Sequence, residues 1–141
     1  MSEYDTDILL WSNEQAALLR RVAAGERVND QVDWENVIEE VESVGRSQLS
    51  AVRSHLIQAL LHDLKAEAWP LSREVPHWRA EAIGQRQEAA EAFAPSMRQH
   101  IDVQTLYARA LRRLPDSIDG QLPLPVPTVC PITLDELLSD E

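Results

Sequence analysis

The hydrophobic and polar positions between Asp33 and Trp69 follow a helical period almost without interruption. The run contains no proline. Asp33 is suited to cap its first turn, because a short side-chain acceptor satisfies a free backbone N–H there. The pattern therefore predicts a long second helix and an all-α fold. Residues recur along one face at steps of three and four: Trp34, Ile38, Val41, Gly45, Leu49, Val52, Leu56, Leu60 and Leu64.

The length of this second helix raises a question about its path. As one rod from Asp33 to Trp69 it would be about 54 Å long at 1.5 Å per residue. A compact domain of this size has a diameter of only about 37 Å. Since Gly and Ser are ordinary sites of helix kinks, we expect a kink or break near Gly45-Arg46-Ser47. The alternative is an unbroken helix whose excess length packs against a second subunit, so the sequence leaves the oligomeric state undecided between monomer and dimer.

Three further helices complete the expected bundle of four main helices over residues 1–114. The first is expected from about Thr6 to Ala24, capped by Asp5 and ended by Gly25. The third is expected from about Pro76 to Ala94, because Pro76 suits a first turn and Pro95 ends a helix. The fourth is expected from Ser96 to about Leu114.

Residues 115–141 are rich in proline, unlike the helical segments before them, and predict an extended C-terminal arm. The stretch QLPLPVPTVCP must be extended, because its prolines stand close together. A capping box, Thr133 to Glu136, then predicts a short terminal helix at Leu134–Leu138. We expect the arm to pack on the bundle, so that residues 1–141 form a single helical domain. Its apolar residues are too many for a free tail: Leu122, Leu124, Val126, Val129 and Ile132.

Charge and composition narrow the class of partner. The net charge of −11 argues against nucleic acid, whose binding depends on Lys and Arg. No run approaches the about 18 consecutive apolar residues of a membrane span, and the acidic N-terminus does not resemble a secretory signal. The one cysteine, Cys130, cannot form an internal disulfide and fits a reducing compartment. We expect a cytoplasmic protein.

An acidic stripe beside the apolar face is the candidate metal site. Glu35, Glu39, Glu42 and Arg46 follow one another at steps of four, three and four. Carboxylates on facing helices can bind metals in bundle cores, usually with a Glu-x-x-His motif, and no histidine stands at that position here. The simpler interpretation is an ion pair between Glu42 and Arg46 at i, i+4. Glu39 and Glu42 stay weak metal candidates, and no cofactor is predicted.

A structural cluster is expected where the third helix meets this stripe. Arg86 follows Trp78 by eight residues and so stays near the inner face, where its charge needs a partner. We predict that Arg86 faces Glu39 and Glu42. The tryptophans are expected to pack in or around the core, with Glu39 or Glu42 accepting from their indole N–H groups. The expected cluster consists of Trp11, Glu39, Glu42, Gly45, Trp78 and Arg86.

Several segments resemble domain-of-unknown-function family 29, a family of small bacterial helical proteins. Matching segments are Tyr4-Asp5 with Trp11, residues 15–20 (QAALLR), residues 36–45 (NVIEEVESVG), residues 61–65 (LHDLK), Trp78 with Gln85-Arg86, Pro95-Ser96 and Cys130-Pro131. The family usually continues past the lysine with an aromatic-Gln-Pro stretch, whereas this chain reads residues 66–70 as AEAWP. The resemblance implies a helical fold and brings no established activity.

The acidic helical scaffold, which has no recognisable catalytic constellation, favours a non-enzymatic role without deciding it. We expect a helical module that acts through protein–protein interaction with a partner the sequence does not identify. The alternative is a metal-dependent enzyme that uses the Glu39/Glu42 stripe.

Overall fold

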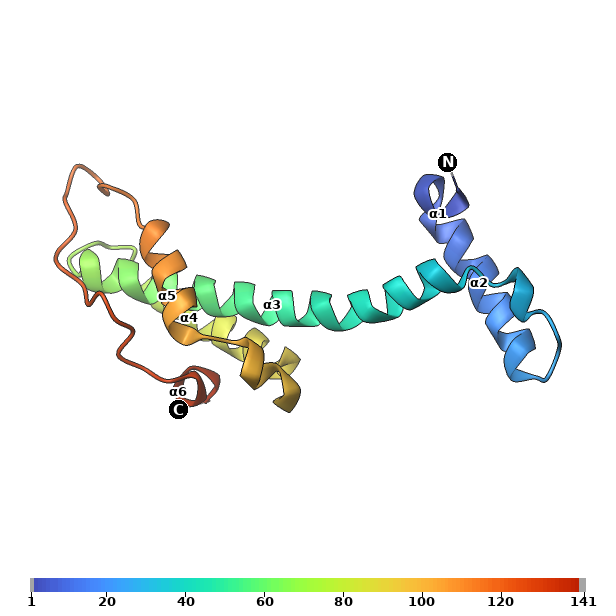
Figure 1. Ribbon diagram of the computed structural model, residues 1–141. Coiled ribbons are helices and arrows are strands. Elements are labelled where there is room, and N and C mark those ends of the chain that lie inside the picture. The colour runs from blue at the N-terminus through green and yellow to red at the C-terminus, as the bar shows by residue number, and fades with distance from the viewer. Residues whose placement is uncertain (1, 140–141) are drawn as a thin grey trace. The chain divides into compact units, whose positions relative to one another are not determined.

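The computed structural model describes residues 2–139, and within them the fold is all-helical, as predicted. The α-helices are α1 (Glu3–Thr6), α2 (Ile8–Ala23), α3 (Trp34–Ala68), α4 (Val75–Ala92), α5 (Val103–Arg112) and α6 (Leu134–Leu138). Two short 3-10 helices, η1 (Asn29–Gln31) and η2 (Pro95–His100), lie between them. Figure 1 shows their order along the chain.

The long helix is uninterrupted, so the break predicted near Gly45 is wrong, and the kink that was its alternative stays a prediction. Helix α3 is continuous over 35 residues, and Figure 1 shows one coil along its whole length. A Cβ added at Gly45 would meet nothing within 4 Å, so no described residue packs closely against this glycine. The contacts instead divide the chain into two compact units, unit 1 up to Arg46 and unit 2 from Ser47. The sequence expectation of one folding domain stays a prediction.

Unit 1 contains α1, α2, η1 and the first part of α3. The first predicted helix corresponds to α2, and α1 precedes it. The predicted cap is wrong, because Asp7 rather than Asp5 caps α2 by accepting from the backbone N–H of Leu10 at 3.1 Å. Gly25 follows α2 with φ +91°, as its predicted role at the helix end requires. The loop after it buries two valines, so the buried core of unit 1 consists of Trp11, Val28 and Val32.

In unit 2, the C-terminal part of α3 packs with the other helices in a larger core. Helix α4 carries Pro76 in its first turn and ends before Pro95, as predicted. The predicted helix from Ser96 to Leu114 is interrupted at Ile101-Asp102. Ile101 turns into the core, and Asp102 caps α5 by accepting from the N–H of Gln104 at 3.1 Å. The core includes Val52, Leu56, Leu60, Leu64, Ala89, Leu106, Tyr107 and Ala110.

The C-terminal arm docks on this core, as expected. Helix α6 has the predicted bounds, and Thr133 caps it through the N–H of Glu136 at 3.2 Å. Leu137 is completely buried, and Cys130 and Leu134 are buried with it. A side chain on α5 also binds the backbone of the extended part. The Gln104 amide donates to the Cys130 carbonyl at 3.2 Å and accepts from the Cys130 N–H at 2.8 Å.

Candidate functional site

The first part of α3 presents apolar side chains that nothing in unit 1 covers. We call this surface the α3 stripe and define it by Trp34, Ile38, Val41 and Val44. Their exposed fractions are 42%, 53%, 69% and 67%. At 3.6 residues per turn the four positions lie within an arc of about 120°. The α3 stripe is therefore one continuous face and not a scatter of single exposed residues.

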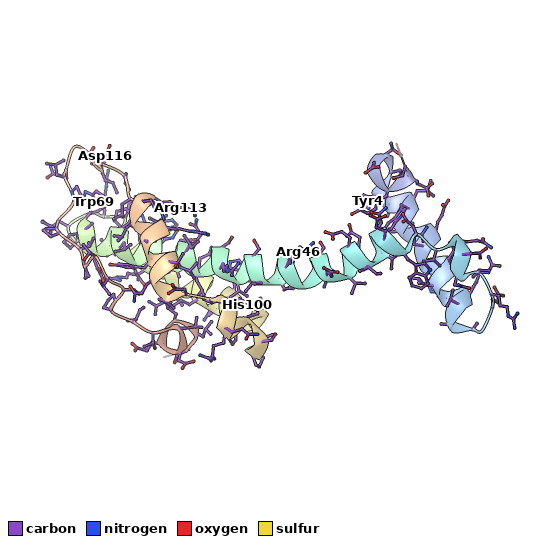
Figure 2. The ribbon with its side chains drawn as sticks, in the orientation of Figure 1. Tyr4, Arg46, Trp69, His100, Arg113 and Asp116 are labelled. Atoms are coloured by element: carbon purple, nitrogen blue, oxygen red, sulfur yellow. The ribbon has the colours of Figure 1, made fainter. Side chains whose placement is uncertain are left out.

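A neighbouring side of the same helix packs against α1 and α2. Tyr4 donates a hydrogen bond to the Glu40 carboxylate, and its ring packs edge-on against Trp11 with centroids 4.8 Å apart. The hydrogen bond to Glu40, followed by burial and nearby carboxylates, raises the pKa of Tyr4 to about 12. Figure 2 marks Tyr4 at this junction. Tyr4 thus fixes the side of α3 beside the stripe, since Glu40 lies about 40° from Val44 around the helix.

Asp33 positions the start of the helix. Its carboxylate accepts from the side-chain amide of Asn36 at 2.8 Å and from the indole Nε1 of Trp11 at 2.9 Å. These hydrogen bonds, that of Asn36 first, lower the pKa of Asp33. The backbone N–H of Asp33 in turn donates to the Gln15 side chain at 2.8 Å. The predicted cap therefore also ties α3 to α2.

An acidic edge runs along the α3 stripe. Glu39 and Glu42 both pair with Arg46, at 2.6 Å and 3.7 Å, and all three side chains are more than half exposed. The predicted Glu42–Arg46 ion pair is confirmed, and Figure 2 marks Arg46 on α3. Glu35 continues the row without an ion-pair partner in residues 2–139. Residues 1–46 carry eleven acidic and four basic side chains, a net charge of −7.

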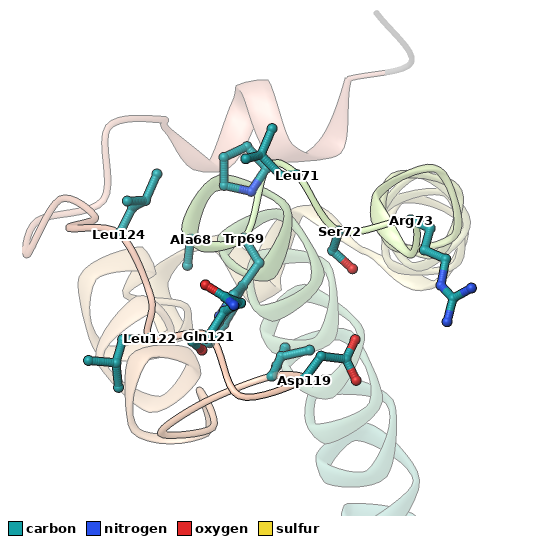
Figure 3. A pocket seen from close by; sticks show the side chains of 11 residues that line it. Ala68, Trp69, Leu71, Ser72, Arg73, Asp119, Gln121, Leu122 and Leu124 are labelled. Atoms are coloured by element: carbon teal, nitrogen blue, oxygen red, sulfur yellow. Dashed lines mark hydrogen bonds between the residues drawn. The ribbon is translucent and has the colours of Figure 1, made fainter.

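A second apolar surface lies in unit 2, where the arm crosses the end of α3. A cavity of about 410 Å³ there is lined by residues 68–73 and by the arm, including Ile118, Gln121, Leu122 and Leu124. The indole of Trp69 donates to the Gln121 carbonyl at 2.9 Å, and the N–H of Leu124 donates to the Ala68 carbonyl at the same distance. Figure 3 shows Leu71 on the turn after α3 and Leu122 on the arm. Leu71 is 99% exposed.

The Arg86 prediction is wrong, because this guanidinium has a different acidic partner. Nη2 of Arg86 lies 2.6 Å from the Asp63 carboxylate, which also pairs with Arg79 at 2.8 Å. The side chains of Arg86 and Asp63 are 26% and 19% exposed. They border a cavity of about 290 Å³ between α3, α4, α5 and the arm. The pair joins α3 to α4, so the expected link between these two helices exists, but through Asp63.

The residues of the expected structural cluster are divided between the two units. Trp11, Glu39, Glu42 and Gly45 belong to unit 1, whereas Trp78 and Arg86 belong to unit 2. Trp11, Trp69 and Trp78 are buried as predicted, and Trp34 is partly exposed. Three indole N–H groups have acceptors other than the predicted Glu39 and Glu42. Trp34 donates to the Asn29 carbonyl at 2.7 Å, Trp11 to the Asp33 carboxylate at 2.9 Å and Trp69 to the Gln121 carbonyl at 2.9 Å.

Residues 2–139 contain no group of three or more His, Cys, Asp or Glu side chains placed to hold a metal ion. Nδ1 of His55 lies 2.7 Å from Oε1 of Gln85, and Nδ1 of His62 lies 2.7 Å from the Gln58 carbonyl. Burial raises the pKa of the Cys130 thiol, which favours the unreactive protonated form. Metal binding by Glu39 and Glu42 stays a prediction.

Within residues 2–139, none of the helices combines the length and apolar character that crossing a bilayer requires.

Comparisons with known proteins place the chain in a family. A crystal structure of an alpha-helical protein of unknown function from Rhodospirillum rubrum is similar in fold, with a TM-score of 0.67 and 22% sequence identity. The similarity covers 100% of this chain and 92% of that one. Comparison with curated proteins found no significant match. The family described as Domain of unknown function DUF29 matches residues 3–141, so the resemblance noted in the sequence is confirmed and the chain belongs to this family.

Proposed function

We propose that the protein is a helical interaction module, and that it binds another protein through the α3 stripe of unit 1. The observation that carries this proposal is that unit 1 exposes more large hydrophobic side chains than it buries. Three hydrophobic residues are buried there, whereas Ile8, Leu9 and Leu10 are exposed together with the four residues of the stripe.

The size of unit 1 makes this imbalance meaningful. Segments of about 40 residues bury too little surface to be stable without help from disulfides, metals or association. Single exposed apolar residues are ordinary on a protein surface, but a contiguous apolar face is typical of an interaction site. Since unit 1 has no disulfide and its helices leave the α3 stripe open, binding of a partner would supply the missing apolar contacts.

The cellular compartment is part of the same proposal. The single cysteine of the chain is a free thiol in the core of unit 2. A buried free thiol is compatible with the reducing cytoplasm, where disulfides are rare. We therefore propose a cytoplasmic partner protein and not a nucleic acid, in keeping with the net charge of −11.

Site-specific photo-crosslinking in the native host tests this function. A photoreactive amino acid at Val41 lies on the α3 stripe, and the same residue at Asn13, which is exposed on α2, serves as the matched control. We expect one reproducible adduct with another polypeptide from position 41 that is absent from position 13. Adducts that join only two copies of this chain, or equal labelling from both positions, would overturn the proposal.

A further inference from the structure

We infer that the partner segment is a basic amphipathic α-helix that lays its apolar face along the α3 stripe and its cationic side chains along the acidic edge. This inference rests on the proposed function and specifies the chemistry of the partner.

The shape of the stripe favours a helical occupant. From Trp34 to Val44 it spans ten residue steps, about 15 Å along one continuous helix. A second helix matches such a face when its own apolar side chains recur at i, i+3, i+4 and i+7. The helix–helix interface would bury both apolar faces and leave the polar sides of both helices in water. An extended strand is less suitable, because it gains affinity from a free sheet edge, and residues 2–139 contain no strand longer than an isolated bridge.

The charge beside the stripe selects a basic partner. Glu35, Glu39 and Glu42 form the edge, and Arg46 pairs with Glu39 and Glu42. Glu35 has no ion-pair partner in the described residues and is exposed. Lys or Arg side chains on the flank of a docked helix would lie beside this row. The surrounding field of unit 1, with a net charge of −7, would also accelerate their encounter.

The same charge disfavours a second copy of this chain as the occupant. Two units of net charge −7 would approach with their acidic edges close together, and like charges at an interface are repulsive. A second copy was the alternative that an unbroken long helix left open. We therefore include self-association as an outcome of the test.

Binding of designed peptides to the full-length chain tests the inference. The first probe is a fluorescently labelled amphipathic peptide of about 18 residues, five helical turns, with leucines on one face and lysines on its flanks. Its twin keeps the leucines and has glutamate in place of each lysine. A third peptide has the composition of the first in an order without helical amphipathicity. Fluorescence anisotropy at several salt concentrations gives Kd, and light scattering gives the mass of the free protein.

We expect the basic peptide to bind at least about tenfold more tightly than its acidic twin, with an affinity that falls as salt screens the charges. Val41→Asp should weaken binding by about tenfold or more, because it places a charge in the centre of the apolar face. Glu35→Gln, which breaks no ion pair, should weaken it by about two- to fivefold. Leu71→Asp changes an equally apolar exposed residue in unit 2 and should leave Kd unchanged.

Each contrary result has a distinct meaning. Equal binding of the acidic twin overturns the charge argument, and equal binding of the reordered peptide overturns the helix argument. If neither helical peptide binds while the adduct from position 41 persists, the inference is wrong and the proposed function stands. A dimeric protein that excludes all peptides identifies a second copy as the occupant and overturns both.

Discussion

The indole Nε1 of Trp11 donates a hydrogen bond of 2.9 Å to the carboxylate of Asp33, and this contact joins α2 to the first turn of α3. Trp11 is one of three buried hydrophobic residues in unit 1, so a single side chain supplies both much of its core and a polar link. The orientation of the α3 stripe depends on this link, because Asp33 stands immediately before Trp34.

The first prediction concerns this contact. Trp11→Phe removes the donor and part of the buried volume, and we expect a loss of about 1–3 kcal/mol in the free energy of unfolding of the segment it stabilises. Hydrogen exchange of the amides in α2 and the first turns of α3 measures the local effect. Trp34→Phe changes a partly exposed tryptophan and serves as the control, with a smaller effect. Equal protection in the wild-type chain and Trp11→Phe would contradict the role given to Trp11.

The second prediction concerns Arg86. A double-mutant cycle between Arg86→Met and Asp63→Asn should give a coupling energy of about 1–3 kcal/mol, since both side chains are largely buried and the pair is a charged hydrogen bond. Cycles of Arg86→Met with Glu39→Gln or Glu42→Gln should be additive within about 0.5 kcal/mol. Arg46→Met, in an exposed pair, should cost less than about 1 kcal/mol. Thermal or urea unfolding measures these energies, and coupling of Arg86 to Glu39 instead of Asp63 would contradict this arrangement.

The third prediction concerns Gly45, which lies inside the continuous helix α3. With no neighbour within 4 Å of its Cβ position, a side chain there meets no obstacle, and glycine inside a helix is less stable than alanine. Gly45→Ala should raise the free energy of unfolding by about 0.5–1 kcal/mol, and Gly45→Leu should stabilise as well. Gly25→Ala is the control and should destabilise, because φ at Gly25 is +91°. A lower melting temperature for Gly45→Leu would reveal a close neighbour at this position.

The parts of the fold that the sequence predicts well are those set by local chemistry. Thr133 and Glu136 define the start of α6, Pro95 limits α4, and Gly25 ends α2. Each acts through its own backbone conformation or through a hydrogen bond to a residue a few positions away. The interruption of the predicted fourth helix carried the same kind of signal, because Asp102 is a strong N-cap residue, and it was missed since the apolar spacing continued through it.

The parts that the sequence predicts poorly depend on which segments meet. The expected break at Gly45 followed from the assumption that all 141 residues share one core, whereas the contacts divide at Arg46. Arg86 was assigned to the densest acidic stretch of the sequence, whereas its partner is Asp63. Asp63 stands in a sparsely charged stretch, where Glu67 is the one other acidic residue within eight positions. Charge density along a sequence does not determine distance in space. For the same reason the sequence placed Trp34, Ile38 and Val41, which are exposed, on one apolar face with the core residues Leu56 and Leu60.

The fourth prediction concerns the arm. Leu137→Ala should lower the free energy of unfolding by about 2–5 kcal/mol, because Leu137 is completely buried in the core of unit 2. Leu122→Ala changes an exposed leucine of the same arm and should cost less than about 0.5 kcal/mol. Truncation after Leu114 removes all of these contacts and should lower the unfolding midpoint more than Leu137→Ala. An unchanged midpoint after truncation would show that the arm contributes nothing to stability.

The last prediction uses the titration of Tyr4. Its pKa of about 12 arises first from the hydrogen bond to Glu40, so Glu40→Gln should lower this pKa toward the ordinary value of 10, whereas Glu39→Gln, which acts only as a more distant charge, should change it little. Because the pKa is raised in the folded chain, the stabilisation is fully present below pH 10 and is lost as the pH rises toward 12. The ultraviolet absorbance of tyrosinate, recorded as the difference between each protein and its Tyr4→Phe variant, isolates Tyr4 from Tyr107, whose pKa burial also raises. An ordinary pKa for Tyr4 in the unmodified chain, or equal effects of the two glutamate substitutions, would contradict the hydrogen bond between Tyr4 and Glu40 that fixes α3 against α1.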